Sequence, residues 1–169
     1  AGSMYGAGTG GLVLMDAMPQ RFQKGMSAEY STGSFGLQNL LLNADFGKPE
    51  NRNHISYAHN QSDGFRNQSA LRRDNMAWTS RLKSTAKQQL TASLLLADME
   101  YETPGGLTLA EFTANPSASR PATGGLPSAE AVNAGIHQQN VLAGISNRQV
   151  ISTHWTNTTS LYCAYATVK

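Results

Sequence analysis

The chain has 169 residues, a formal net charge of +2, and 14% charged and 40% hydrophobic residues. This small net charge, without a basic cluster, argues against nucleic-acid binding, and the single cysteine, Cys163, excludes an internal disulfide. No apolar run reaches the roughly 20 residues of a membrane-spanning helix. The charged fraction is low for a soluble domain, where about 25% is usual, and it suits a sheet with one lipid-facing and one water-facing side.

The first segment, residues 4–15, is glycine-rich and then apolar. Residues 6–11 match the dinucleotide-binding pattern G-x-G-x-x-G, which requires a following helix and an acidic residue about 20 positions later. Pro19 prevents a useful helix and Asp16 lies too close, so we exclude a nucleotide site. Glycine instead permits close packing of backbones. We assign that structural role to Gly6, Gly8, Gly10 and Gly11.

From residue 25 onward, segments of about 8–12 residues alternate between apolar and polar positions, which is the pattern of antiparallel strands. Within 37–46, one face carries Leu40, Leu42, Ala44 and Phe46. Within 72–83, Met76, Trp78 and Leu82 are predicted to oppose Asn75, Thr79, Arg81 and Lys83. The run Leu94-Leu95-Leu96 breaks the alternation and leaves its faces open. Strands of this length with one apolar face are typical of transmembrane β-barrels.

The connections between these strands are predicted to differ in length on the two sides of the sheet. Turns at 47–53, 84–87 and 150–154 fall on one side, and the long connection 103–137 falls on the other. Short periplasmic turns and long external loops are the rule for outer-membrane barrels. Within the long loop, Thr108 and Glu111 form a capping box that opens a short helix ending before Asn115-Pro116. Ser128 is predicted to cap a second short helix that ends at Gly135.

No motif for catalysis or metal binding can be picked out of the sequence. His54 and His59 are five positions apart and would face opposite sides of a strand, so they do not form a local metal pair. Asp98, Glu100 and Glu102 share a strand face and indicate a solvated barrel mouth. Trp155 and three tyrosines at strand positions, Tyr30, Tyr101 and Tyr162, are consistent with aromatic girdles.

Residues 3–14, with the sequence SMYGAGTGGLVL, resemble the plug-end pattern of TonB-dependent outer-membrane receptors. Residues 33–36 resemble the first hairpin of their barrels, 62–66 the exposed turn after the third strand, and 101–108 the head of an external loop in iron-complex receptors, including the ferric-citrate-like branch. Leu14-Met15-Asp16 departs from the usual asparagine-containing end of the plug strand. The TonB-contacting segment and the plug apex would lie outside this chain.

The resemblance implies a bacterial outer-membrane protein with a 22-stranded barrel and an N-terminal plug. Residues 1–22 would be the end of the plug and residues 23–169 about seven strands of an all-β, antiparallel transmembrane barrel. The family imports a scarce ferric siderophore or similar chelate, with energy delivered by TonB. The resemblance therefore implies a transporter that is not an enzyme and needs no cofactor. The chelate would be a transported ligand, bound from outer loops by side chains such as Arg66, Arg72, Arg73, Glu102 and Arg120, because arginine pairs well with anionic groups.

Two other functions stay open at this point. A passive outer-membrane porin shares the strand pattern, and a soluble all-β carbohydrate-binding or carbohydrate-active domain shares the composition. Receptors for siderophores, citrate, haem, cobalamin and sugars share one architecture, so the ligand is left open. An incomplete barrel has two bare sheet edges, so we expect the 169-residue piece not to be a stable, functional protein by itself.

Overall fold

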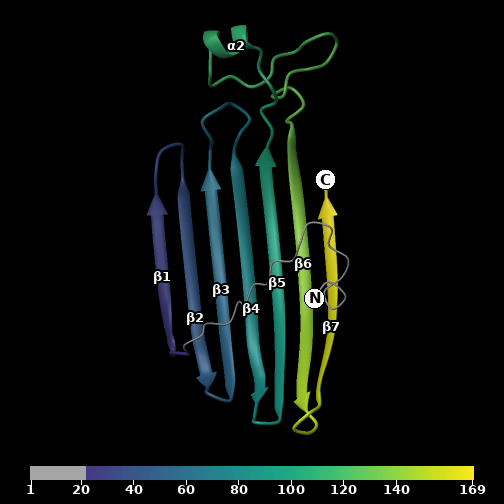
Figure 1. Ribbon diagram of the computed structural model, residues 1–169. Helices are drawn as coiled ribbons and strands as arrows, with labels where there is room; N and C mark the ends of the chain where they lie inside the picture. The colour runs from purple at the N-terminus through teal and green to yellow at the C-terminus, as the bar shows by residue number, and fades with distance from the viewer. Residues whose placement is uncertain (1–21) are drawn as a thin grey trace.

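The structure is a computed structural model that describes residues 22–169. Seven β-strands form a single antiparallel sheet in which each strand pairs with the next along the chain (Figure 1). The strands are β1 (Gly25–Thr32), β2 (Gln38–Lys48), β3 (Asn51–Ser62), β4 (Leu71–Ser84), β5 (Gln88–Glu102), β6 (Gly135–Val150) and β7 (Thr156–Val168), and the helix is α2 (Leu109–Ala114). The prediction of an all-β fold with seven antiparallel strands is therefore confirmed.

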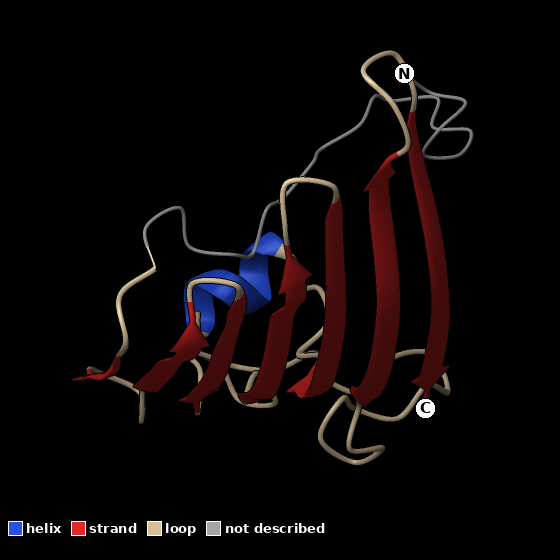
Figure 2. Cartoon of the chain, turned by 90° about the horizontal axis from the view of Figure 1, so that it is seen from below, coloured by secondary structure: helices blue, strands red, loops and turns tan. Residues whose placement is uncertain are grey.

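The sheet is one layer thick and is not closed. Seen from below, the strands lie side by side with no second layer of strands over them (Figure 2), and β1 and β7 form the two edges. Among the described residues only Ala129, Ser80 and Ser119 are buried. The sheet therefore has no packed hydrophobic core. No helix in residues 22–169 is long and apolar enough to cross a membrane.

The register places large apolar side chains on one side of the sheet, here called the apolar face. Two rows of directly paired residues cross all seven strands on this face. They are Ala28, Leu42, Tyr57, Met76, Leu96, Val141 and Tyr165, and, one step lower, Met26, Ala44, Ile55, Trp78, Leu94, Ala143 and Cys163. The predicted partition of 37–46 is thereby confirmed, since Leu42 and Ala44 lie in these rows.

The opposite side, here called the polar face, carries smaller and more polar side chains. One row that crosses all seven strands contains Ser27, Asn43, Ser56, Ala77, Leu95, Leu142 and Ala164. The triple leucine is now assigned, because Leu94 and Leu96 pair with Trp78 and Met76, whereas Leu95 pairs with Ala77. Tyr101 and Tyr162 also belong to the polar face, whereas Tyr30 lies on the apolar face. The tyrosines predicted to form girdles therefore do not share one face of the sheet.

One predicted face is changed by a β-bulge in β4. The register shifts between Arg81 and Lys83, so that Lys83 pairs with Leu90. Because a bulge places two residues opposite one, Lys83 moves to the apolar face instead of opposing it. The prediction for this side chain is therefore wrong, and the apolar face ends in a charged residue at its lower edge.

The connections alternate in position as predicted. The short turns after β2, β4 and β6 lie at one end of the sheet, and α2 with the long β5–β6 loop lies at the other (Figure 1). This loop covers 103–134 and not 103–137, because Gly135 and His137 pair with Glu102 and Glu100. The β2–β3 connection is tighter than predicted and consists of Pro49 and Glu50.

The β2–β3 turn depends on a glycine. Gly47 has φ +113°, and a Cβ at this position would meet the backbone oxygen of Asn51. We expect Gly47→Ala to lower the free energy of unfolding by about 1–3 kcal/mol, measured as a shift of the urea midpoint. Gly25→Ala is the matched control, because a Cβ there has no neighbour within 4 Å. Equal midpoints for the two variants would contradict this expectation.

The predicted plug end falls almost entirely outside the described residues. Gly6, Gly8, Gly10 and Gly11 lie in the segment 1–21, which the structure does not describe. Their structural role and the boundary at residue 22 stay predictions.

Candidate functional site

The loops at the α2 end of the sheet form one connected unit, here called the outer-loop cluster and defined as residues 33–37, 62–70 and 103–134. The first two segments meet where the Asp63 backbone N–H donates to the Phe35 carbonyl oxygen at 2.8 Å. The Phe35 and Phe65 rings pack edge to face, with centroids 5.7 Å apart. The β1–β2 hairpin therefore rests on the β3–β4 loop.

Arg66 joins the β3–β4 loop to the long β5–β6 loop. Its Nε donates to the Ala118 carbonyl oxygen and its Nη2 to the Gly105 carbonyl oxygen, both at 2.9 Å. The neighbouring Asn67 backbone N–H donates to the Ser117 carbonyl oxygen at 2.8 Å. Two of the guanidinium donors thus hold loop backbone, and the side chain acts as a tether between two loops.

Arg120 and Glu102 are likewise occupied with loop structure. Arg120 Nη2 donates to the Pro127 carbonyl oxygen at 2.8 Å, and Glu102 Oε2 accepts from the Ala70 backbone N–H at 2.9 Å. Ala129 and Ser119, two of the buried residues of the described chain, lie in the same loop. The long loop is therefore a folded cap with a small interior.

The helix in this cap confirms the first capping prediction and corrects the second. Thr108 and Glu111 form the reciprocal capping box of α2, which ends at Ala114. After Ser128 there is only a turn, although the Ser128 hydroxyl does accept from the Ala131 backbone N–H. Asn133 adopts φ +47° directly after this turn. That left-handed conformation ends the helical path, so the predicted second helix is wrong.

The capping box makes the order of α2 sensitive to pH. The Thr108 backbone N–H and hydroxyl bond the Glu111 carboxylate at 2.7 and 2.8 Å and hold the pKa of this carboxyl below its usual range. A depressed pKa means that the carboxylate's stabilising effect is present above the ordinary carboxyl pKa and is lost as the pH falls through the lowered value.

We therefore expect the Phe112 and Asn115 amides, which donate to the Thr108 and Glu111 carbonyls, to lose protection against hydrogen exchange as the pH falls below the ordinary glutamate pKa, after correction for intrinsic rates. In the Glu111→Gln variant this loss should be absent. An identical pH dependence in both proteins would contradict the assignment.

A hollow of about 410 Å³ opens in the outer-loop cluster. It is lined by Arg66, Leu107, Thr108, Leu109 and Phe112. Leu109 is 81% exposed and Phe112 is 55% exposed. This wall is therefore apolar and open to solvent, and it lies next to the guanidinium group of Arg66. Such a surface fits a ligand that combines apolar or aromatic groups with negative charge.

The remaining predicted ligand residues, Arg72 and Arg73, are neighbours on β4 and point to opposite faces. Arg73 Nη2 donates to Asn60 Oδ1 at 3.1 Å on the polar face. Arg72 Nε donates to Asp74 Oδ2 at 3.2 Å on the apolar face. The structure thus places Arg66 and Arg120 in the outer-loop cluster and Glu102 at its border, where it accepts from the Ala70 backbone N–H. It separates Arg72 from Arg73.

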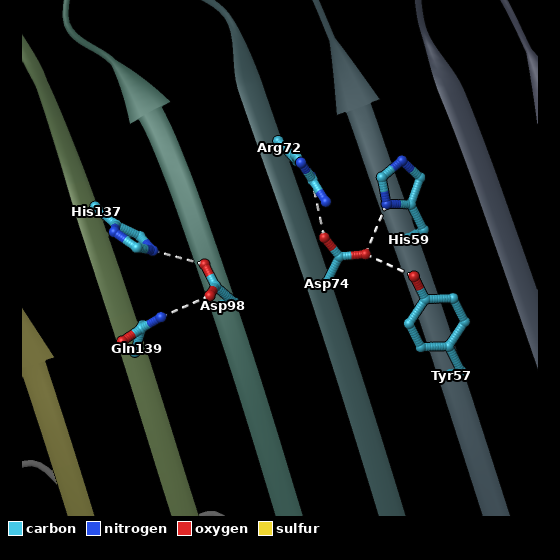
Figure 3. A network of polar contacts seen from close by, with 7 residues as sticks. All are labelled: Tyr57, His59, Arg72, Asp74, Asp98, His137 and Gln139. Atoms are coloured by element: carbon cyan, nitrogen blue, oxygen red, sulfur yellow. Dashed lines mark hydrogen bonds and ion pairs between the residues drawn. The ribbon is translucent and has the colours of Figure 1, made fainter.

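A second set of polar side chains crosses the upper part of the apolar face, as Figure 3 shows. We call it the polar band; its members are Tyr57, His59, Arg72, Asp74, Asp98, Glu100, His137 and Gln139. Asp74 Oδ1 accepts from the Tyr57 hydroxyl at 2.6 Å and lies 2.7 Å from His59 Nδ1. Asp98 lies 2.8 Å from His137 Nε2 and accepts from Gln139 Nε2, also at 2.8 Å.

Sequence reasoning placed Asp98 and Glu100 on one strand face and singled out Arg72. It missed the band that these residues form with their neighbours on other strands. The missing information was the register, which sets Asp74 beside Asp98 and His59 beside Asp74. In residues 22–169 no group of three or more histidine, cysteine, aspartate or glutamate side chains is placed to hold a metal ion. The band is therefore a hydrogen-bonded border between the apolar rows and the outer loops.

No protein-family model matches the sequence, and a comparison with curated proteins finds no match either. The evidence for function is consequently the sequence motifs, the single-layered sheet and the outer-loop cluster.

Proposed function

We propose that the seven strands are part of the wall of a bacterial outer-membrane β-barrel. The observation that carries this proposal is the uncovered apolar face. Leu42, Met76, Leu96 and Val141 lie in one row on this face and are each more than a third exposed. In water this surface would favour aggregation, whereas a lipid bilayer would cover it. Strands β2 to β7 have 11 to 16 residues, which is long enough to cross a membrane, where about 9–11 residues are needed.

The unpaired edges of the sheet are evidence for further strands beside β1 and β7. Every residue of β1 is exposed, and β7 pairs with β6 on only one side. In a bilayer each unpaired N–H and C=O group costs several kcal/mol, so membrane sheets close into barrels. We therefore propose that the intact protein completes the barrel with strands beyond the seven described.

We further propose that this barrel is an active-transport receptor for an iron chelate, energised through TonB. The support for this narrower statement is the motif resemblance at residues 3–14, 33–36, 62–66 and 101–108, together with a folded outer cap. The solvent-exposed hollow beside Arg66 offers an anionic chelate one cation and the apolar wall of Leu107, Leu109 and Phe112. Passive porins need no such ligand-binding surface.

Uptake by cells that produce the intact protein tests the proposal. We expect saturable uptake of radiolabelled ferric chelates under iron limitation, lost when the proton gradient is collapsed or TonB is deleted. The purified protein in a planar bilayer should show no steady conductance. Steady conductance with uptake that survives loss of TonB would identify a porin instead. A protein that stays folded and monomeric without detergent would favour a soluble β-domain.

A further inference from the structure

Two adjoining hollows mark the upper part of the apolar face. The lower one, of about 360 Å³, is walled by the aromatic rings of Tyr57 and Tyr165 with Met76, Leu96 and Val141 between them. The upper one, of about 350 Å³, lies among members of the polar band. Asp74 and Asp98 line both hollows. Together they form one groove that is apolar at the lower end and charged at the upper end.

The charged end offers both a cation and carboxylates to a ligand. The Arg72 side chain is 67% exposed and uses only Nε for Asp74, so its two Nη groups have no hydrogen-bond partner in residues 22–169. Glu100 is the direct cross-strand neighbour of Arg72 and is exposed. Asp98 is 51% exposed. One guanidinium therefore stands beside two solvent-accessible carboxylates.

We propose that this groove binds a membrane lipid whose headgroup carries both a phosphate and a primary amine, as phosphoethanolamine does. The Arg72 Nη groups would donate to the phosphate, a pairing that suits the planar guanidinium. The ammonium would donate to Glu100 and Asp98. One acyl chain would lie over Met76, Leu96 and Val141. The inference rests on the proposed function, because only a sheet face inside a bilayer meets lipid.

The charges of the groove favour this headgroup over the two common alternatives. A purely anionic headgroup would pair with Arg72 but would face the negative charges of Asp98 and Glu100. A trimethylated amine carries the same charge as a primary amine but has no N–H to donate to a carboxylate. The order of affinity should therefore be primary amine first, trimethylated amine second and anionic glycerol headgroup last.

Native mass spectrometry of the intact protein in mild detergent tests this order. The probes are phosphatidylethanolamine, phosphatidylcholine and phosphatidylglycerol with identical acyl chains, added at equal concentration. We expect phosphatidylethanolamine to be bound about three- to fivefold more than phosphatidylcholine, the ratio that one or two exposed charged contacts supply. Glu100→Gln should remove most of this preference. Glu29→Gln, which changes an exposed carboxylate on the polar face of β1, should leave it unchanged.

The outcomes separate the inference from the proposed function. Equal binding of the amine and trimethylated lipids by a detergent-folded protein, or an unchanged preference in Glu100→Gln, would overturn the lipid site alone. A protein that is folded without detergent and binds none of the three lipids would overturn the barrel wall, and the lipid site with it. Arg72→Gln supplies a second check, because it should lower the binding of all three phosphate-bearing lipids.

Discussion

Replacing Leu94 by arginine is expected to destabilise the intact protein in a lipid bilayer by about 2–4 kcal/mol, the cost of a charged side chain on the lipid face near the midplane of a barrel. Leu94 lies between Trp78 and Ala143 in the lower row of the apolar face. The measurement is the urea-induced unfolding transition of the protein in phospholipid vesicles.

The neighbouring Leu95→Arg is the matched control. It makes the same substitution one residue further along the same strand, but Leu95 pairs with Ala77 and Leu142 on the polar face. A side chain that faces the barrel interior does not enter the lipid, so the loss should be clearly smaller than that of Leu94→Arg. Equal losses for the two variants, or a larger loss for Leu95→Arg, would contradict the assignment of the two faces.

The second large effect is expected at the loop tether. Arg66→Met keeps an extended side chain but removes the two charge-assisted hydrogen bonds to Ala118 and Gly105. Each such bond contributes about 1.5–3 kcal/mol in a shielded site. Because Arg66 is partly exposed, we expect the two bonds together to contribute less than two shielded bonds would, about 2 kcal/mol in total. The 103–134 loop should then exchange its amide hydrogens roughly tenfold or more faster.

Two readouts separate tethering from direct ligand contact. Hydrogen exchange of the Asn67 and Arg120 amides reports on loop order, because both donate to backbone oxygens within the outer-loop cluster. Chelate binding by the intact protein reports on function. Arg73→Met is the control, since its guanidinium contacts Asn60 on the strand and should leave loop exchange unchanged. Unaltered loop exchange in Arg66→Met would contradict the tether.

The strands could be predicted from the sequence because membrane-length alternation is a local signal. Apolar side chains recur at every second position in Leu40, Leu42, Ala44 and Phe46. Because successive side chains of a strand point to opposite faces of the sheet, this period places all four on one face. The capping box of α2 was also local, since Thr108 and Glu111 are three residues apart. Features that depend only on residues close together in the sequence could thus be predicted.

The polar band and the bulge could not be predicted from the sequence in the same way. Asp74 and Asp98 are 24 residues apart and meet only because β4 and β5 pair in one particular register. The bulge between Arg81 and Lys83 shifts one strand against its neighbour, and a single sequence holds no clear mark of such a shift. The roles of Arg66, Glu102 and Arg120 also depend on loop geometry, which residue type alone does not specify.

The most direct test of the barrel wall uses Cys163, the single cysteine of the chain. It is exposed and pairs with Ala143 on the apolar face. A nitroxide attached there, with the intact protein in vesicles, should collide more often with oxygen, which concentrates in lipid, than with a water-soluble nickel chelate. After the label is moved to Ala164 (Cys163→Ala with Ala164→Cys), which lies on the polar face, the preference should reverse. A label at Cys163 that meets the nickel chelate more often than oxygen would contradict a lipid-facing apolar face.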